Sequence, residues 1–504
     1  MNSTIKSPEA VCLITPPSPF LLDERVFMHI GILKVASSLE SKGHLVEFLD
    51  LSGIENYLKV VEDYCRSTKI KTFGLTASTP QVPFAVQIAQ VIRATCPDSK
   101  IILGGPHVTL MNTASKREIK KGLDKSNRAT EDVNKLSELF DVLVCGDGEY
   151  TIFGALEIDK GIIDADDRKS PYFLTNQQFS ELPLPARHLL DVDSYRYEIE
   201  GRKSTSLIAQ LGCPFKCSFC SGRNSPFLRK IRQRSSESII DEMRLLYNEY
   251  GFTGFMFYDD ELNVNKGLID LLNMITDLQH EVGEEFRLRG FVKAELFNDA
   301  QAEAMYRAGF RWLLTGFESG DERILRNIKK MAKRDDNTRA VEIAKRHNLK
   351  VKALMSIGHA GESYETVENT KNWLLEVQPE EFDCTIITTY PGSPYFDDAI
   401  KRPDGTYVYT SDLTGDKLYQ SSIDYLSELD YYKGDPDGGY ISYVWTDYLQ
   451  PADLVSARDA LEKEVRQKLG IKFNPARPAQ KYEHSMGQGN IKIPEYILRK
   501  SKVV

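Results

Sequence analysis

Three cysteines lie close together in the stretch LGCPFKCSFCSG, at residues 211–222. Cys213, Cys217 and Cys220 have the spacing Cys-x3-Cys-x2-Cys. Structural zinc normally takes four protein ligands, whereas this stretch holds three thiols and no histidine. A cubane iron–sulfur cluster binds one thiolate at each iron, so three thiolates leave one iron open to another ligand. The spacing favours such a cluster, and a zinc site completed by a distant Cys or His is the alternative.

The elements around these cysteines alternate between strand and helix. Six strand candidates follow in order: SLIAQ, GFMFYD, FRLRGFV, RWLLTGF, KVKALMSIG and FDCTIITTY. Helical stretches such as SIIDEMRLLYNEYG separate them. A run of parallel βα units predicts a barrel or partial barrel, whose chemistry lies at the carboxyl ends of its strands. The cysteines directly follow the first strand, where such a site is expected.

The first 150 residues show a second alternation. AVCLITPPSP, VEFLDL, TFGLTAS, KIILGG and DVLVCG predict five strands of an open, doubly wound parallel sheet. Residues 110–138 are predicted to be a polar insertion in a surface connection. The chain is therefore expected to be α/β. Its parts are a Rossmann-like domain at 1–150, a linker at 151–203, a partial (β/α)6 barrel of TIM type at 204–400 and a mainly helical C-terminal domain at 401–504.

The composition of the chain limits its expected cellular location and its binding partners. The net charge of −9 over 504 residues and the pI near 5.6 argue against general nucleic-acid binding. No apolar run reaches the roughly 18 residues of a membrane-spanning helix. The start MNSTIKSPEA lacks the pattern of a secretory signal, so a cytoplasmic location is expected.

The cysteine spacing, with Phe219 just before the last cysteine, resembles the signature of the radical S-adenosylmethionine (SAM) superfamily. The resemblance implies a [4Fe–4S] cluster whose open iron binds SAM, which one electron then cleaves to a 5'-deoxyadenosyl radical. It also implies SAM contacts in the strand-end motifs YDDE, GFESG, SIGHAGES and TYPGSP. The residues implied to contact SAM are Phe219 in the cysteine loop and, in these motifs, Asp259, Asp260, Gly316, Glu318, Ser319, Ser356 and Tyr390. Purely structural roles in loops and turns are the alternative for these positions.

The ends of the N-terminal strands resemble the cobalamin-binding domain that precedes the radical SAM barrel in one large subfamily. The motifs LGGPHVT, TAST and GDGE carry this resemblance. It implies a cobalamin site at Thr15, His29, Gly31, Thr76, Ser78, Gly104, Gly105, Pro106, Gly146, Gly148 and Glu149. His29 lies two residues before Gly31, which departs from the Asp-x-His-x-x-Gly pattern of proteins whose histidine binds cobalt. His29 is therefore either a cobalt ligand or a packed histidine.

The resemblance implies a cobalamin-dependent methyltransferase that modifies an unactivated carbon through methylcobalamin and a 5'-deoxyadenosyl radical. One alternative is a different radical reaction, with or without cobalamin, such as ring formation, ring contraction or transfer of another SAM-derived group. A non-catalytic cobalamin or cluster sensor is the other alternative. The expected partners are a small-molecule, lipid or peptide substrate and an electron donor such as flavodoxin or ferredoxin. The Tyr-rich stretch with Tyr425, Tyr431 and Tyr440 either lines a substrate entrance or packs the C-terminal region onto the barrel.

Overall fold

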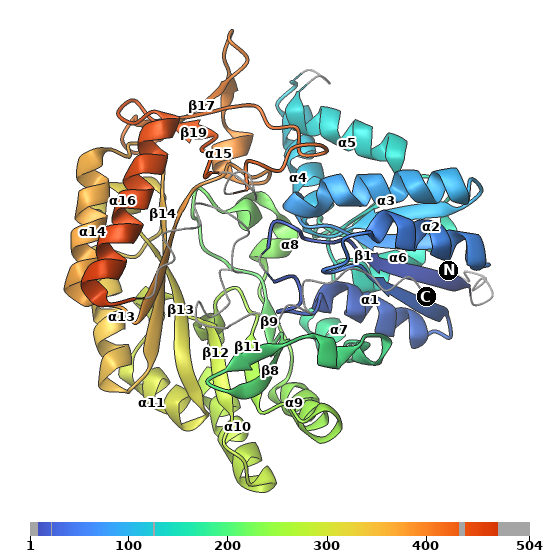
Figure 1. Ribbon diagram of the computed structural model, residues 1–504, viewed down its shortest axis with the longest axis horizontal. Helices are drawn as coiled ribbons and strands as arrows, with labels where there is room; N and C mark the ends of the chain where they lie inside the picture. The colour runs from blue at the N-terminus through green and yellow to red at the C-terminus, as the bar shows by residue number, and fades with distance from the viewer. Residues whose placement is uncertain (1–8, 22, 124–126, 433–438, 472–504) are drawn as a thin grey trace.

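The computed structural model describes residues 9–21, 23–123, 127–432 and 439–471. Two α/β units lie side by side, with a smaller C-terminal region against the second unit (Figure 1). The N-terminal unit contains a parallel six-stranded sheet in the order β2-β1-β3-β4-β5-β6. Its strands are β1 (Ala10–Thr15), β2 (Leu45–Asp50), β3 (Thr72–Thr76), β4 (Lys100–Gly104), β5 (Val142–Cys145) and β6 (Gly161–Asp164). The strand order reverses between β1 and β3, so a ligand crevice is expected at their carboxyl ends.

Helices cover both faces of this sheet, as the sequence predicts for a doubly wound fold. α1 (Ile30–Glu40) and α6 (Gly148–Glu157) pack on one face. The other face carries α2 (Tyr57–Ser67), α3 (Val82–Thr95), α4 (Pro106–Lys120) and α5 (Arg128–Leu139). The sequence-based prediction of a polar insertion at 110–138 is therefore wrong. Ala129, Val133 and Leu136 recur at helical spacing and are buried, so α5 is an amphipathic helix with its polar residues outside.

The segment 151–203, predicted as a linker, contributes to both sheets. Strand β6 pairs with β5 and completes the N-terminal sheet. After the short helix α7 (Asn176–Ser180), β7 (Tyr197–Ile199) pairs antiparallel with the first barrel strand. This segment thus joins the two units through hydrogen-bonded strands.

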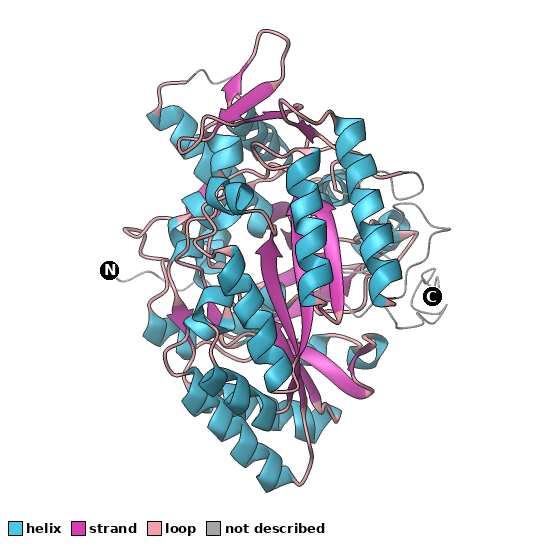
Figure 2. Cartoon of the chain, turned by 90° about the vertical axis from the view of Figure 1, so that its left-hand side faces the viewer, coloured by secondary structure: helices cyan, strands magenta, loops and turns pink. Residues whose placement is uncertain are grey.

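The second unit contains a seven-stranded sheet in the order β15-β14-β13-β12-β11-β8-β7. Figure 2 shows that its long strands curve and that helices lie across one face. Its six parallel strands are β8 (Arg202–Leu207), β11 (Gly254–Phe257), β12 (Arg287–Phe291), β13 (Phe310–Glu318), β14 (Lys350–Ile357) and β15 (Glu381–Ile386). They correspond to the six predicted strands. The helices between them are α9 (Ser236–Tyr250), α10 (Leu268–Val282), α11 (Asp299–Arg307), α13 (Arg334–Arg346) and α14 (Tyr364–Val377). They share one hydrophobic core with one face of the sheet, including Phe255, Leu288 and Val351.

The opposite, concave face of this sheet is covered in part by the N-terminal unit. Met256 of β11 and Leu314 of β13 are buried there with Tyr197 of β7. Val26 and Phe27, from the loop before α1, pack against the same cluster. The first loop of one unit therefore reaches the interior of the other.

The C-terminal region begins with α15 (Pro394–Asp397) and ends, within the described residues, with α16 (Pro451–Leu469). The predicted amphipathic helix is confirmed by α16, which buries Leu454, Leu461 and Val465 and packs on α14 and β15. A small antiparallel sheet lies between the two helices. Its strands are β16 (Ile400–Lys401), β17 (Tyr407–Thr410), β18 (Lys417–Gln420) and β19 (Val444–Trp445). Within the described residues, no helix combines the length and apolar character needed to cross a membrane.

Candidate functional site

The cysteine loop is closed at its base by two short strands. β9 (Gln210–Leu211) and β10 (Arg232–Gln233) pair antiparallel on either side of it, and α8 (Pro226–Arg229) lies within it. The Cys213 N–H donates to the Leu228 carbonyl at 2.9 Å. Gly212 has a φ of +94°, and a Cβ there would lie 2.1 Å from the Lys230 carbonyl oxygen. Only glycine fits that position, which turns the chain from β9 into the loop.

The donor set of this loop fits a cubane cluster with one open iron. Cys213 and Cys217 are half-buried, Cys220 is exposed, and all three are free thiols. Burial raises the pKa of the Cys213 thiol to about 12. Within the described residues, no three His, Cys, Asp or Glu side chains are grouped closely enough to hold a metal ion. Cluster binding would therefore draw the three sulfurs together and remove their protons.

Asp259 and Asp260, predicted to contact SAM, bind the backbone that leads into the loop. Asp259 accepts hydrogen bonds from the N–H groups of Ala209, at 3.3 Å, and Gln210. Asp260 accepts one from the Gly212 N–H at 2.9 Å. Burial raises the pKa of Asp259 to about 7. These carboxylates fix the approach to the cysteines, and direct SAM contact stays a prediction.

Glu318 lies at the centre of a second polar group, at the end of β13. Its carboxylate accepts a hydrogen bond from Ser356 Oγ at 2.8 Å and pairs with Lys330 Nζ at 3.2 Å. A Cβ on Gly316 would lie 2.5 Å from Glu318 Oε1. Gly316 therefore leaves the space that the Glu318 carboxylate occupies. The structure brings together three of the residues predicted to contact SAM, namely Gly316 and Glu318 of GFESG and Ser356 of SIGHAGES.

Two residues of this group were not selected from the sequence. Lys330 is buried; burial opposes its charge, but Glu318 and the other acidic groups near it raise its pKa above the usual value. His359 is fully buried, and burial lowers its pKa to about 4. Its Nε2 lies 2.9 Å from Ser356 Oγ, and its ring centroid lies 5.4 Å from that of Phe219. His359 connects the Glu318 group to the cysteine loop, and its position in the turn SIGHAGES was the available signal.

Ser319 and Tyr390 have other surroundings. The Ser319 hydroxyl lies 3.0 Å from Thr370 Oγ1 of α14, within the packing between helix and sheet. Tyr390 packs against the core of the N-terminal unit, with its ring centroid 6.3 Å from that of Tyr431. A role for either residue in SAM binding stays a prediction.

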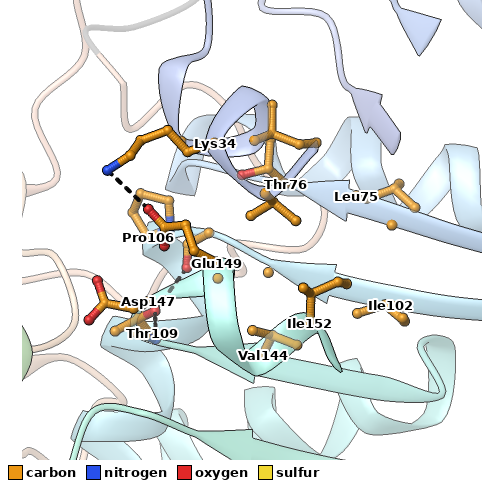
Figure 3. Close-up of a pocket in the computed structure, with 18 of the residues that line it drawn as sticks. Lys34, Leu75, Thr76, Ile102, Pro106, Thr109, Val144, Asp147, Glu149 and Ile152 are labelled. Atoms are coloured by element: carbon orange, nitrogen blue, oxygen red, sulfur yellow. Dashed lines mark hydrogen bonds and ion pairs between the residues drawn. The ribbon is translucent and has the colours of Figure 1, made fainter. Parts of the chain in front are cut away.

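A cavity of about 300 Å³ opens among the strand ends of the N-terminal sheet (Figure 3). Its walls include most of the predicted cobalamin residues, namely Gly31, Thr76, Gly104, Gly105, Pro106, Gly146, Gly148 and Glu149. Its deeper lining is apolar, with Leu75, Ile102 and Val144. Lys34 and Glu149 form an ion pair of 3.2 Å at one side, as Figure 3 shows. We refer to this space as the sheet cavity.

Glycines create the sheet cavity. A Cβ on Gly74 would lie 2.7 Å from the Leu13 side chain, and one on Gly148 would lie 2.8 Å from Val35. Gly105 has a φ of +102°, and a Cβ there would lie 2.7 Å from the Ala77 nitrogen. Side chains at these positions would collide with the walls or fill the space. A doubly wound sheet binds ligands at its strand ends, where this cleft lies. Its bare backbone and apolar walls fit the cobalamin nucleotide tail that the family resemblance implies.

A second cavity, of about 470 Å³, lies between the two units. His29 and Ser78 line it from the N-terminal unit, and Ser206 and Tyr258 line it from the barrel. Gly31, Ile32, Thr76, Pro106 and Ile208 line both this space and the sheet cavity. The two spaces therefore adjoin. We refer to the second as the interdomain cavity.

Thr15 and His29 complete the set of predicted cobalamin residues. Thr15 lines neither cavity, and its hydroxyl is buried with no hydrogen-bond partner in the described part of the chain. His29 lies at the N-terminus of α1 on the wall of the interdomain cavity, and burial lowers its pKa. A neutral imidazole on that wall has the protonation state that a cobalt ligand needs, and ligation itself stays a prediction.

Two family models match this chain, in the order of its two units. The B12 binding domain matches residues 25–124, and the radical SAM superfamily matches residues 207–374, a range that holds all three cysteines and Glu318. The chain belongs to the radical SAM enzymes that carry a cobalamin-binding domain. Radical SAM enzymes of this kind use a [4Fe–4S] cluster, SAM and cobalamin, and the residues described above fit these three groups.

Relatives agree with this assignment. An uncharacterized methyltransferase of Pyrococcus horikoshii is 29% identical over 394 residues, which are 77% of this chain and 83% of the relative. The anaerobic magnesium-protoporphyrin IX monomethyl ester cyclase of Cereibacter sphaeroides is 25% identical over 346 residues, 64% of this chain and about half, 52%, of the cyclase. The solved structure of the radical SAM methyltransferase TsrM of Kitasatospora setae, with cobalamin and a [4Fe–4S] cluster bound, has the same fold. Its TM-score is 0.63 at 17% identity, over 93% of this chain and 90% of TsrM.

Proposed function

We propose that this radical SAM enzyme is a cobalamin-dependent methyltransferase that modifies a carbon atom of a small organic molecule. The continuity of the two cavities carries the proposal. The sheet cavity and the interdomain cavity share five lining residues, and the latter reaches Ser206, Ile208 and Tyr258 at the ends of β8 and β11. A cofactor bound in this continuous space would face the strand ends that carry the cysteine loop. The name of the relative from Pyrococcus horikoshii supports methyl transfer.

The chain's own residues have distinct tasks in this proposal. When bound, the cluster and SAM supply a radical that removes hydrogen from the substrate, and cobalamin supplies the methyl group. Cys213, Cys217 and Cys220 would hold the cluster. The two oxygens of Glu318, kept in place by Lys330 and Ser356, can accept hydrogen bonds from the hydroxyl or ammonium groups of SAM.

The concave face of the barrel sheet supports a substrate with apolar or aromatic surface. Phe27 and Tyr258 pack at the mouth of this face with ring centroids 5.4 Å apart, and both line the interdomain cavity. Phe291 of β12 and Trp312 of β13 pack against the buried cluster of Tyr197, Met256 and Leu314 on the same face. Aromatic rings hold apolar molecules while a phenol group supplies a polar contact. A small molecule or a lipid portion that enters from the interdomain cavity would meet these rings.

Product stoichiometry tests the proposal. The 504-residue protein is reconstituted anaerobically with iron, sulfide and hydroxocobalamin, and iron and cobalt per chain are measured. Candidate substrates are then supplied with SAM and a reductant, and the products are quantified. Methyl transfer yields S-adenosylhomocysteine and 5'-deoxyadenosine together, with one methylated product for each pair. Formation of 5'-deoxyadenosine and a product without an added methyl group would contradict the proposal and favour another radical reaction.

Matched cysteine variants locate the cluster in the same experiment. Cys217→Ala removes one expected ligand, so iron content and 5'-deoxyadenosine formation should both be lost. Cys384→Ala changes a cysteine that is buried in the barrel core, and it should keep the iron content of the original protein. Equal iron loss in both variants would show that the cysteine loop does not hold the cluster.

A further inference from the structure

A basic hollow of about 780 Å³ lies on the surface beside the cysteine loop. α12 (Glu322–Asn327), the following turn through Lys333, and residues 413–414 form its walls. Lys216, Arg326 and Lys333 are exposed there. Met331 and Leu413 also line it, and their side chains are 70% and 50% exposed. The hollow thus combines exposed cations with an uncovered apolar centre.

The charge of this hollow is opposite in sign to the net charge of the chain. The chain has a net charge of −9, yet five cations and a single carboxylate line the hollow. Lys329 pairs with Asp412 at 2.7 Å, and Arg323 pairs with Asp416. Within the described part of the chain, Lys216 and Arg326 have no carboxylate partner. A positive surface with uncompensated charge therefore stands out on an acidic protein.

The hollow adjoins the cysteine loop. Lys216 directly precedes Cys217, so the rim of the hollow is part of the loop itself. Phe219 packs against the buried cluster of Ile324, Leu325 and Ile328, of which Leu325 also lines the hollow. The Ser218 N–H donates to the Ile328 carbonyl at 2.8 Å. An electron entering at the hollow would have a short, packed path to a cluster on the loop.

The backbone that forms one wall is held in an unusual conformation. Lys329 and Met331 both have positive φ angles, +53° and +72°, which side chains other than glycine rarely adopt. Between them, Lys330 is buried and pairs with Glu318. This turn thus presents Met331 to solvent on one side and Lys330 to the predicted SAM site on the other. Such conformations gather at functional positions, where the surrounding structure maintains them.

We infer that the basic hollow is the docking surface for a small acidic protein that carries single electrons, of the flavodoxin or ferredoxin kind. The inference rests on the proposed function, because the electron is needed by the cluster. In each transfer the reduced carrier loses one electron and the cluster gains one, and no bond or proton passes between the two proteins. Complementary charge guides the carrier to this hollow while the acidic remainder of the surface repels it. Met331 and Leu413 supply the apolar contact at the centre.

Direct binding of an oxidised flavodoxin tests the inference without catalysis. Calorimetry at low ionic strength compares the reconstituted protein with the double variant Arg326→Glu/Lys333→Glu and with Met331→Asp. The control, Lys463→Glu/Lys468→Glu, makes the same charge change at exposed positions of α16. We expect the dissociation constant to rise at least tenfold in both hollow variants and to change less than twofold in the control. Equal affinity in the hollow and control double variants would overturn the inference.

Two ways of reducing the cluster separate the inference from the proposed function. Dithionite is a small reductant that needs no docking surface, so it should drive 5'-deoxyadenosine formation within twofold of the original rate in the hollow variants. Reduced flavodoxin should act with a KM at least tenfold higher in those variants. Failure of SAM cleavage with dithionite in the unaltered protein would refute the proposed function, whereas the binding experiment would still decide the docking surface.

Discussion

Three residues hold Glu318 in place. One is a glycine, and the other two lie far from Glu318 in the sequence. Gly316 provides the space for its carboxylate, while Lys330 and Ser356 bind the two carboxylate oxygens. Glu318 itself has a positive φ of +68°. A non-glycine residue in this region requires support from its surroundings. The position of the Glu318 carboxylate therefore depends on all three residues, and a substitution at any of them should weaken SAM binding.

Replacing Gly316 with alanine should weaken SAM binding and leave the cluster in place. The added Cβ would lie 2.5 Å from Glu318 Oε1, so the carboxylate must move away. We expect the dissociation constant of SAM to rise about tenfold, which corresponds to about 1.4 kcal/mol. Equilibrium dialysis with labelled SAM measures this, with iron content recorded in parallel. Gly267→Ala is the control, because its Cβ would meet only ordinary contacts, and unchanged SAM affinity in Gly316→Ala would contradict the prediction.

His107 should make the stability of the protein depend on pH. It is fully buried in α4, and burial lowers its pKa to about 3 from the ordinary 6.5. Between these values the unfolded chain binds the proton more strongly. The stability that His107 contributes is therefore present above pH 6.5 and is lost as the pH falls toward 3.

The variant His107→Gln removes this titration. As the pH falls from 6 to 4, the unfolding free energy of the original protein should drop relative to the variant by about 1.4 kcal/mol per pH unit. Denaturant titrations at several pH values measure the difference. His280→Gln, at an exposed position of α10, should behave as the original protein does. Parallel pH curves for His107→Gln and the original protein would show that the prediction is wrong.

At the scale of elements, the carboxyl end of β4 forms part of the wall of the sheet cavity. A Cβ on Gly104 would lie 3.7 Å from Val144, an ordinary contact, so alanine should fit without strain. Valine adds two methyl groups that project toward the cavity. We expect Gly104→Ala to bind cobalamin nearly as well as the original protein and Gly104→Val to lose most bound cobalt. Cobalt and iron per chain after reconstitution test this series, and equal cobalt in both variants would refute it.

The elements were predicted better than their contacts. The alternation of apolar runs predicted the six parallel barrel strands, and the strand-end motifs predicted residues that the structure groups around two adjoining cavities. α5 was missed because its polar residues outnumber the three apolar ones that recur at helical spacing. β16 and β19 have two residues each, too few for any periodic pattern. The contact between Lys330 and Glu318 depends on left-handed backbone at Lys329 and Met331, which no sequence pattern indicates.

At the scale of the whole molecule, a buried ion pair joins the two units. Arg232 of β10 pairs with Asp147 at the start of α6, and both side chains are almost wholly buried. The Arg232 guanidinium also lies 4.4 Å from the centroid of the Phe227 ring. Because Asp147 lines the sheet cavity, this pair connects the cobalamin-binding unit to the strand that closes the cysteine loop. Removing one partner leaves a buried charge without compensation.

The variant Arg232→Met should therefore cost about 3 kcal/mol of unfolding free energy. The double variant Arg232→Met/Asp147→Asn, which also removes the stranded carboxylate charge, should recover more than half of that loss. Denaturant unfolding of the protein without cofactors measures both. The exposed pair of Arg244 and Glu281 provides the comparison, since Arg244→Met should cost less than about 1 kcal/mol. A double variant as unstable as Arg232→Met would show that the buried charge is not the cause.

The walls of the sheet cavity also limit how such enzymes can be recombined. Ile208 and Leu211 precede the three cysteines, and Phe227 and Leu228 follow them, yet all four line a cavity whose other walls belong to the N-terminal unit. The two units are thus not interchangeable modules with a plain linker between them. A chimaera made from two relatives by cutting near residue 200 would join the cavity of one parent to the loop flanks of the other. A chimaera that takes residues 208–228 from the same parent as the N-terminal unit keeps the native cavity wall. We expect this chimaera to fold.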